Sequence, residues 1–193
     1  MAKSEDYRRA EKMCIQEGFT LEKVGNLSNV LLTGYRDGKW ERQYNPRMED
    51  IFVDETTDKQ NIRRRFLDVM ILPIEKSKQQ QVYLIESVIA RPWFDSKINL
   101  VLDELADFRT NGEDYRAILE ACYIHPDKKR DYEIMDELGL SKSVFYEKRR
   151  VATVIFGILL WKYAKRREYE DMAKGLVPAH EICAGDCSDN KVV

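Results

Sequence analysis

The sequence predicts an all-α protein, with a helical N-terminal part followed by a C-terminal helix-turn-helix that has a long second helix. Apolar residues recur at spacings of three and four through the middle of the chain, and no segment shows sustained alternation with a period of two. The 193 residues include only five prolines and nine glycines, so few positions interrupt a helix. This length fits one domain with appendages.

The helical pattern is clearest between residues 58 and 173. The first predicted helix covers about residues 58–72, where Ile62, Phe66 and Val69 share a face and Pro73 ends the helix. A later helix, from about residue 95, carries a plausible C-terminal cap in Asn111-Gly112. The remaining helices are expected at about residues 78–90, 115–124, 131–138 and 141–173.

The first 57 residues are less regular. Residues 1–17 are compatible with a short helix, whereas residues 18–35 are apolar without a clear period and residues 37–46 resemble a loop. We therefore divide the chain into a poorly defined N-terminal extension (1–57), a helical domain (58–124), a helix-turn-helix region (125–173) and a tail (174–193). The tail is expected to be disordered, because it is rich in small polar residues.

Composition excludes several classes of protein. Apolar residues make up 44% and charged residues 34% of the chain, an ordinary globular balance. The longest apolar stretch, residues 151–161, is much shorter than the roughly 20 residues of a membrane span, so no membrane contact is expected. The N-terminus lacks the apolar core of a secretory signal, and the four cysteines are scattered. We expect a cytoplasmic protein with free thiols.

Residues 131–150 have the pattern of a helix-turn-helix. A short helix ends at Leu138, and Gly139 permits the left-handed conformation of a tight turn. Ser141 is expected to cap the second helix by accepting a hydrogen bond from its first amides. A small core between the two helices is expected from Ile134, Leu138, Leu140 and Phe145.

The second helix has a charge suited to DNA. Between residues 142 and 167, eight Lys or Arg side chains accompany one acidic residue, which gives a local net charge of +7 in a protein whose total is −2. Lys148 and Arg149 are predicted to contact phosphates, and Ser141 to combine capping with a phosphate contact. The outward face of the first turns, which would reach base edges in a major groove, holds Lys142, Ser143, Tyr146, Glu147 and Arg150.

Two of these side chains have specific expected partners. Glu147 would accept a hydrogen bond from cytosine N4, and Arg150 would pair with O6 and N7 of guanine.

The span DYEIMDELGLSKSVFYEKRRVA resembles the C-terminal helix-turn-helix of sigma-factor region 4 and, more closely, the ArpU family of phage transcriptional regulators from Gram-positive bacteria. Two residues depart from the usual region 4 pattern, because Met135 replaces a small residue and Lys148 an apolar one. The resemblance covers about residues 60–170 and is carried by Tyr132, Glu133, Ile134, Leu138, Gly139, Leu140, Ser141, Phe145, Tyr146 and Ala152.

This resemblance implies a DNA-binding regulator of late phage genes, such as those for packaging or lysis. Its partners would be double-stranded promoter or operator DNA and the host RNA polymerase, in the cytoplasm of the bacterial host. The alternatives are a polymerase-binding adaptor, a packaging protein similar to a small terminase subunit, and a helical bundle that binds nothing. Residues 151–163 are apolar nearly all round, so they either pack against the helices of residues 58–123 or form the seam of a homodimer.

Other candidate sites are weak. His180, Cys183 and Cys187 provide three of the four ligands that a zinc site normally needs, so no metal is expected. Arg63, Arg64 and Arg65 are interpreted as a solvated face, with a second phosphate contact as the alternative. We find no catalytic set and no cofactor motif, and we do not expect an enzyme.

Overall fold

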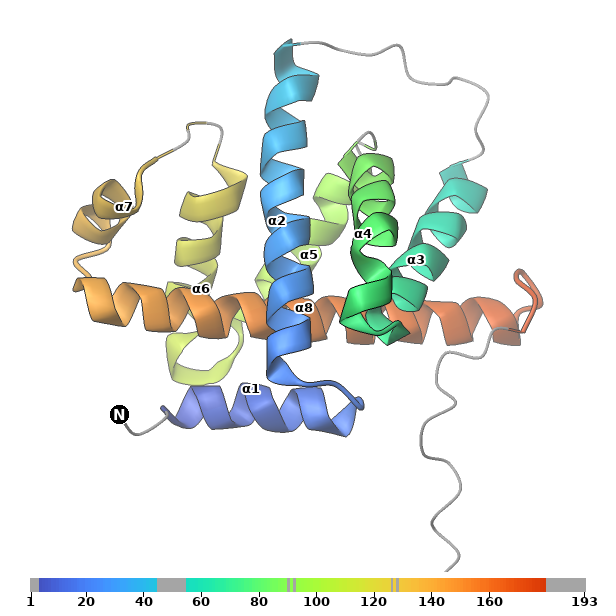
Figure 1. The fold of residues 1–193 in the computed structure, drawn as a ribbon, viewed down its shortest axis with the longest axis horizontal. Helices are drawn as coiled ribbons and strands as arrows, with labels where there is room; N and C mark the ends of the chain where they lie inside the picture. Colours follow the sequence, from blue (N-terminus) through green and yellow to red (C-terminus); the bar gives the residue numbers. More distant parts are fainter. Residues whose placement is uncertain are drawn as a thin grey trace, which may run out of the picture.

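The computed structural model describes residues 4–44, 55–89, 91, 93–125, 127 and 129–179, and in them the fold is all-α, without a strand. A long helix, α8 (Lys142–Ala173), runs through the molecule, and the other helices pack around it (Figure 1). These are α1 (Glu5–Gln16), α2 (Leu21–Tyr44), α3 (Glu55–Ile71), α4 (Ile74–Ile89), α5 (Trp93–Ala106), α6 (Gly112–Leu119) and α7 (Asp131–Glu137). A 3₁₀ turn, η1 (Arg109–Asn111), precedes α6, and a π-helical turn, η2 (Glu120–Ile124), follows it.

The middle of α8 is buried on every side. Each residue from Val151 to Trp161 is buried, and α1, α2, α3, α5 and α6 all pack against this helix. A helix that is apolar all round needs such complete cover. Of the two interpretations of residues 151–163, packing inside the chain is therefore confirmed. The homodimer seam at this segment is wrong, because the chain's own helices occupy the surface.

Small residues let α2 cross α8 at close range (Figure 1). A Cβ atom on Gly157 of α8 would lie 1.8 Å from Ser28 Oγ and 2.9 Å from Val24 Cγ1 of α2. Ser28 is itself buried and donates a hydrogen bond to the carbonyl oxygen of Val24 at 2.7 Å, which satisfies its hydroxyl within the contact. The crossing depends on the absence of a side chain at Gly157.

The first 57 residues contain two helices that belong to the core: α1, which the short helix expected within residues 1–17 anticipates, and α2, which the sequence left undefined. Ala10 and Cys14 of α1 and Val24, Leu32 and Tyr35 of α2 are buried in the same cluster as the middle of α8. The loop expected at residues 37–46 is wrong, because α2 continues to Tyr44. Three glycines lower the helix propensity of α2. At least one of them serves packing, because a Cβ on Gly34 would lie 2.3 Å from Ile85 Cγ2 of α4.

The chain between α5 and α6 also differs from the prediction. Gly112 was expected to cap the preceding helix, but it begins α6 with an ordinary helical φ of −58°. Its lack of a side chain is needed for a different reason, because a Cβ there would lie 2.1 Å from the carbonyl oxygen of Ala106.

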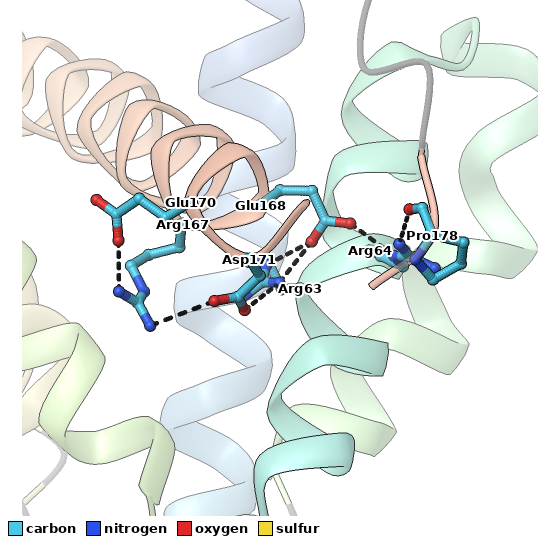
Figure 2. A network of polar contacts seen from close by, with 7 residues as sticks. All are labelled: Arg63, Arg64, Arg167, Glu168, Glu170, Asp171 and Pro178. Carbon is cyan, nitrogen blue, oxygen red and sulfur yellow. Dashed lines mark hydrogen bonds and ion pairs between the residues drawn. The ribbon is translucent and has the colours of Figure 1, made fainter. Parts of the chain in front are cut away.

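Buried ion pairs join α3 to the C-terminal part of α8 (Figure 2). Arg63 donates from Nε to Glu168 Oε2 at 2.7 Å and from Nη2 to Asp171 Oδ2 at 2.9 Å, and Arg64 donates from Nε to Glu168 Oε1 at 2.6 Å. The Glu168 side chain is fully buried, so its charge depends on both guanidinium groups. The third arginine, Arg65, lies over the ring of Tyr83 with 4.7 Å between its Cζ atom and the ring centre.

The prediction of a solvated face is therefore corrected for Arg63 and Arg64, which face the protein and fix α3 against α8 (Figure 2). Arg65 is exposed, as that prediction expects.

We predict that Gly157→Ala destabilises the protein by about 1–3 kcal/mol, the usual cost of forcing extra atoms into a packed core. The measurement is the free energy of unfolding in urea. Ser28→Ala removes the oxygen closest to the new methyl group, so the double variant should recover part of the loss while Ser28→Ala alone changes little. Equal stability of Gly157→Ala and the unmodified protein would contradict the close crossing.

Candidate nucleic-acid interface

The turn between α7 and α8 has the geometry that the sequence predicts. Gly139 has a φ of +62°, in the left-handed region. The amide of Gly139 donates to the carbonyl oxygen of Asp136 at 3.2 Å, and that of Leu140 to the carbonyl oxygen of Met135 at 2.8 Å. These bonds satisfy the last carbonyl groups of α7 and set the direction in which the chain enters α8.

A separate small core holds the helix-turn-helix together. Ile134 and Phe145 are buried in it, and Leu138 and Leu140 pack against it, as predicted. The structure adds Ile118 of α6, which is fully buried in the same cluster. The motif thus has three helical parts, α6 with η2, α7 and α8, and the expected domain boundary at residues 124–125 falls inside it.

One face of the first turns of α8 is exposed. This face, which we call the reading face, consists of Lys142, Ser143, Tyr146, Glu147 and Arg150. An α-helix with its side chains is about 10–12 Å in diameter, which fits the ~12 Å width of a DNA major groove. Within the described residues no ion pair involves Lys142 or Arg150, so both charges remain available to a ligand.

Two neighbouring elements border the reading face. The guanidinium carbon of Arg150 lies 5.5 Å from the ring centre of Tyr7 in α1, a stacking contact that orients the arginine. A cleft of about 240 Å³ separates this end of α8 from the start of α2, where Glu22 and Asn26 line it. The reading face therefore ends where α1 and α2 begin to cover α8.

Lys148 and Arg149 form ion pairs with other helices of the motif. Lys148 pairs with Asp114 of α6, and Arg149 donates from Nη1 to Asp131 Oδ1 of α7 at 3.0 Å. Both side chains are half-buried. These two cations fix α8 against the other helices of the motif, and their contact with phosphates stays a prediction.

The charge counted along α8 is also smaller than the sequence suggests. Lys165 pairs with Glu17 of α1 at 2.9 Å, and Arg167 pairs with Glu170 at 2.5 Å. These two cations thus offset acidic groups of the same chain. The reading face itself holds two cations and Glu147, a net charge of +1.

Ser141 precedes α8, but its side chain does not cap the helix as expected. No amide of the first turn donates to it, and its Oγ lies 3.4 Å from Ser143 Oγ. Both hydroxyl groups are exposed, so they remain available at the leading end of the helix.

Asp131 contacts two side chains of the candidate interface, and sequence reasoning missed it. Besides Arg149, it binds Tyr146, whose hydroxyl donates to Asp131 Oδ2 at 2.9 Å. This hydrogen bond to the carboxylate raises the pKa of Tyr146. Burial is the largest single influence on the pKa of Arg149 and lowers it, but the charges of Asp131, Tyr123 and Cys122 together with a hydrogen bond to Cys122 outweigh it, so the net shift is upward. The available signal was an acidic residue in the first turn of α7, which is ordinarily explained by the helix dipole alone.

The described residues contain no group of three or more His, Cys, Asp and Glu side chains that could hold a metal ion. The candidate ligands His180, Cys183 and Cys187 lie outside the described residues. Burial raises the pKa of the Cys14 thiol to about 11, and it also raises that of Cys122. Among the described helices, none combines the length and apolar character that crossing a membrane requires.

A comparison with protein families gives a match over part of the chain. Residues 96–156 match the family described as Protein of unknown function (DUF1492). The matched segment runs from α5 to the middle of α8, so it includes α6, η2, α7 and the whole reading face. No curated protein and no solved structure matches the chain.

We predict that Asp131→Asn lowers the pKa of Tyr146 toward the usual tyrosine value of about 10. A neutral amide can still accept the hydrogen bond, but it no longer opposes the negative charge of the ionised phenol. The measurement is a pH titration of the tyrosine side chains by NMR. Asp136→Asn, an exposed change on the same helix, should leave the titration of Tyr146 unchanged, and an equal response of the two variants would contradict the contact.

Proposed function

We propose that this protein is a transcription regulator that binds double-stranded DNA by placing the reading face of α8 in a major groove. The observation that supports the proposal most is the exposure of Lys142, Ser143, Tyr146, Glu147 and Arg150 on one face of a helix that follows a well-formed helix-turn-helix turn. Such motifs use the first turns of their second helix to contact base edges.

The division of charge supports the same orientation. Lys148 and Arg149 pair with carboxylates of α6 and α7 and are half-buried, whereas Lys142 and Arg150 are exposed. Arg150 is suited to a bidentate contact with guanine, and Glu147 to a hydrogen bond from cytosine N4. Because the rear of α8 is buried and the front is open, a duplex can approach from one direction only.

The biological setting follows from the sequence resemblance to phage transcriptional regulators. We propose control of late genes, such as those for packaging or lysis, in a bacterial host. A homodimer would need a surface other than residues 151–161, since these are buried within the chain. Each chain is therefore expected to contact a single stretch of major groove.

The proposal is tested by selecting bound duplexes from a random DNA pool. A regulator should enrich one motif, and its affinity for that motif should fall by orders of magnitude between ~50 and ~200 mM salt, because phosphate contacts release counterions. An adaptor that binds protein through apolar contacts should enrich no motif and should respond weakly to salt.

We predict that Arg150→Ala weakens binding to the selected duplex by about 1–3 kcal/mol and relaxes base preference at one position. The measurement is fluorescence anisotropy with a set of single-base variants of the duplex. Arg166→Ala is the matched control: it removes the same charge from the same helix, at a side chain that is 67% exposed but lies beyond the buried middle of α8. If both variants bind every duplex as the unmodified protein does, the docking geometry is wrong.

A further inference from the structure

We propose that a cleft between α3, α5 and α8 binds an anionic amphiphile, a small molecule with an apolar body and one carboxylate or phosphate group. The cleft has a volume of about 370 Å³, within the range of roughly 300–1,000 Å³ that is usual for ligand sites. It lies along the C-terminal half of α8, away from the reading face, and the proposal does not depend on DNA binding.

The interior of the cleft suits an apolar body. Its lining is mainly apolar and includes side chains from α3 and α8 that belong to the buried core or pack against it, such as Ile62, Phe66 and Leu160. Trp93 of α5 and Tyr163 of α8 also line it and are half-buried, so they extend from the core to the surface. Ligand sites in proteins typically combine such apolar and aromatic walls with a few polar groups that set orientation.

The charged groups around the cleft are almost all cationic. Five Lys or Arg side chains line it, against Asp171 as the one acidic residue in the lining. Asp171 accepts from Arg63 at 2.9 Å and lies 3.7 Å from Arg167, so it is shared between two arginines (Figure 2). The carboxylate therefore offsets the charge of that end of the cleft, and it leaves Lys97 and Lys174 without an acidic partner in the described lining.

The lysine ammonium groups are positioned against the aromatic walls. Lys97 Nζ lies 5.9 Å from the ring centre of Tyr163, and Lys59 Nζ lies 5.7 Å from that of Trp93. In the part of the chain that the structure describes, neither Lys97 nor Lys174, the third lysine of the lining, forms an ion pair. A carboxylate or phosphate bound beside Lys97 would give it an anionic partner at the edge of an apolar space, where charges interact more strongly than in water.

This arrangement predicts which ligands the cleft distinguishes. The apolar body supplies most of the binding free energy, because it removes apolar surface from water. The anionic group adds the interaction with the lysines, so a neutral or cationic molecule with the same body should bind less well.

The test is isothermal titration calorimetry of the full chain with decanoate, used below its micelle concentration. Decan-1-ol and decyltrimethylammonium carry the same apolar body without the negative charge. We expect saturable 1:1 binding of decanoate, with at least tenfold weaker binding of the other two molecules.

Lys97→Glu should weaken decanoate binding at least tenfold. Lys12→Glu, which makes the same charge change on an exposed residue of α1, should leave it unchanged, and circular dichroism should show that both variants stay folded. Three results would each overturn the proposal: no saturable binding of decanoate to the full chain, equal affinity for decanoate and decan-1-ol, or equal affinity of the two variants. Because none of these measurements involves DNA, the failure of this proposal is separate from that of the proposed function.

Discussion

The burial of the middle of α8 is the constraint on which the rest of the structure depends. Eleven consecutive residues, Val151 to Trp161, contribute to the core from every side of one helix. A helix buried in this way cannot shift along its axis without disrupting contacts with several neighbours at once. Its two ends are therefore held as rigid extensions of the core, the leading end in the helix-turn-helix and the trailing end beside α3 (Figure 1).

The polar contacts follow from that constraint. At the leading end, Lys148 and Arg149 turn toward carboxylates of α6 and α7, while the exposed side keeps Lys142 and Arg150. At the trailing end, two arginines of α3 share the buried Glu168 (Figure 2). The cations at the leading end of α8 thus fall into two groups. Lys148 and Arg149 are half-buried and attach the helix to the protein, whereas Lys142 and Arg150 are exposed.

Much of the fold could be predicted from the sequence, because the relevant signals are local. The helices from α3 onward follow from apolar spacing, and the turn at Gly139 follows from its position between two amphipathic segments. The packing of Ile134 and Phe145 could likewise be anticipated from their places on facing helices. α2 could not be predicted in this way, since its glycines serve contacts with α4 and α8 that are distant in sequence.

The same limit applies to the candidate site. The exposed reading face is a matter of helical geometry and could be expected, but the partners of Lys148 and Arg149 come from α6 and α7, and the sequence alone does not pair them. The aromatic and cationic lining of the cleft comes from α3, α5 and α8 and likewise requires the tertiary structure.

Hydroxyl-radical footprinting of the side chains, with and without the duplex selected from a random pool, tests the central claim most directly. Tyr146 lies on the reading face and is 38% exposed, whereas Tyr83 on α4 and Tyr169 near the end of α8 are exposed away from it. The account predicts that DNA lowers the oxidation rate of Tyr146 several-fold and leaves the other two unchanged. A DNA complex in which Tyr146 is oxidised as fast as in the free protein would contradict it.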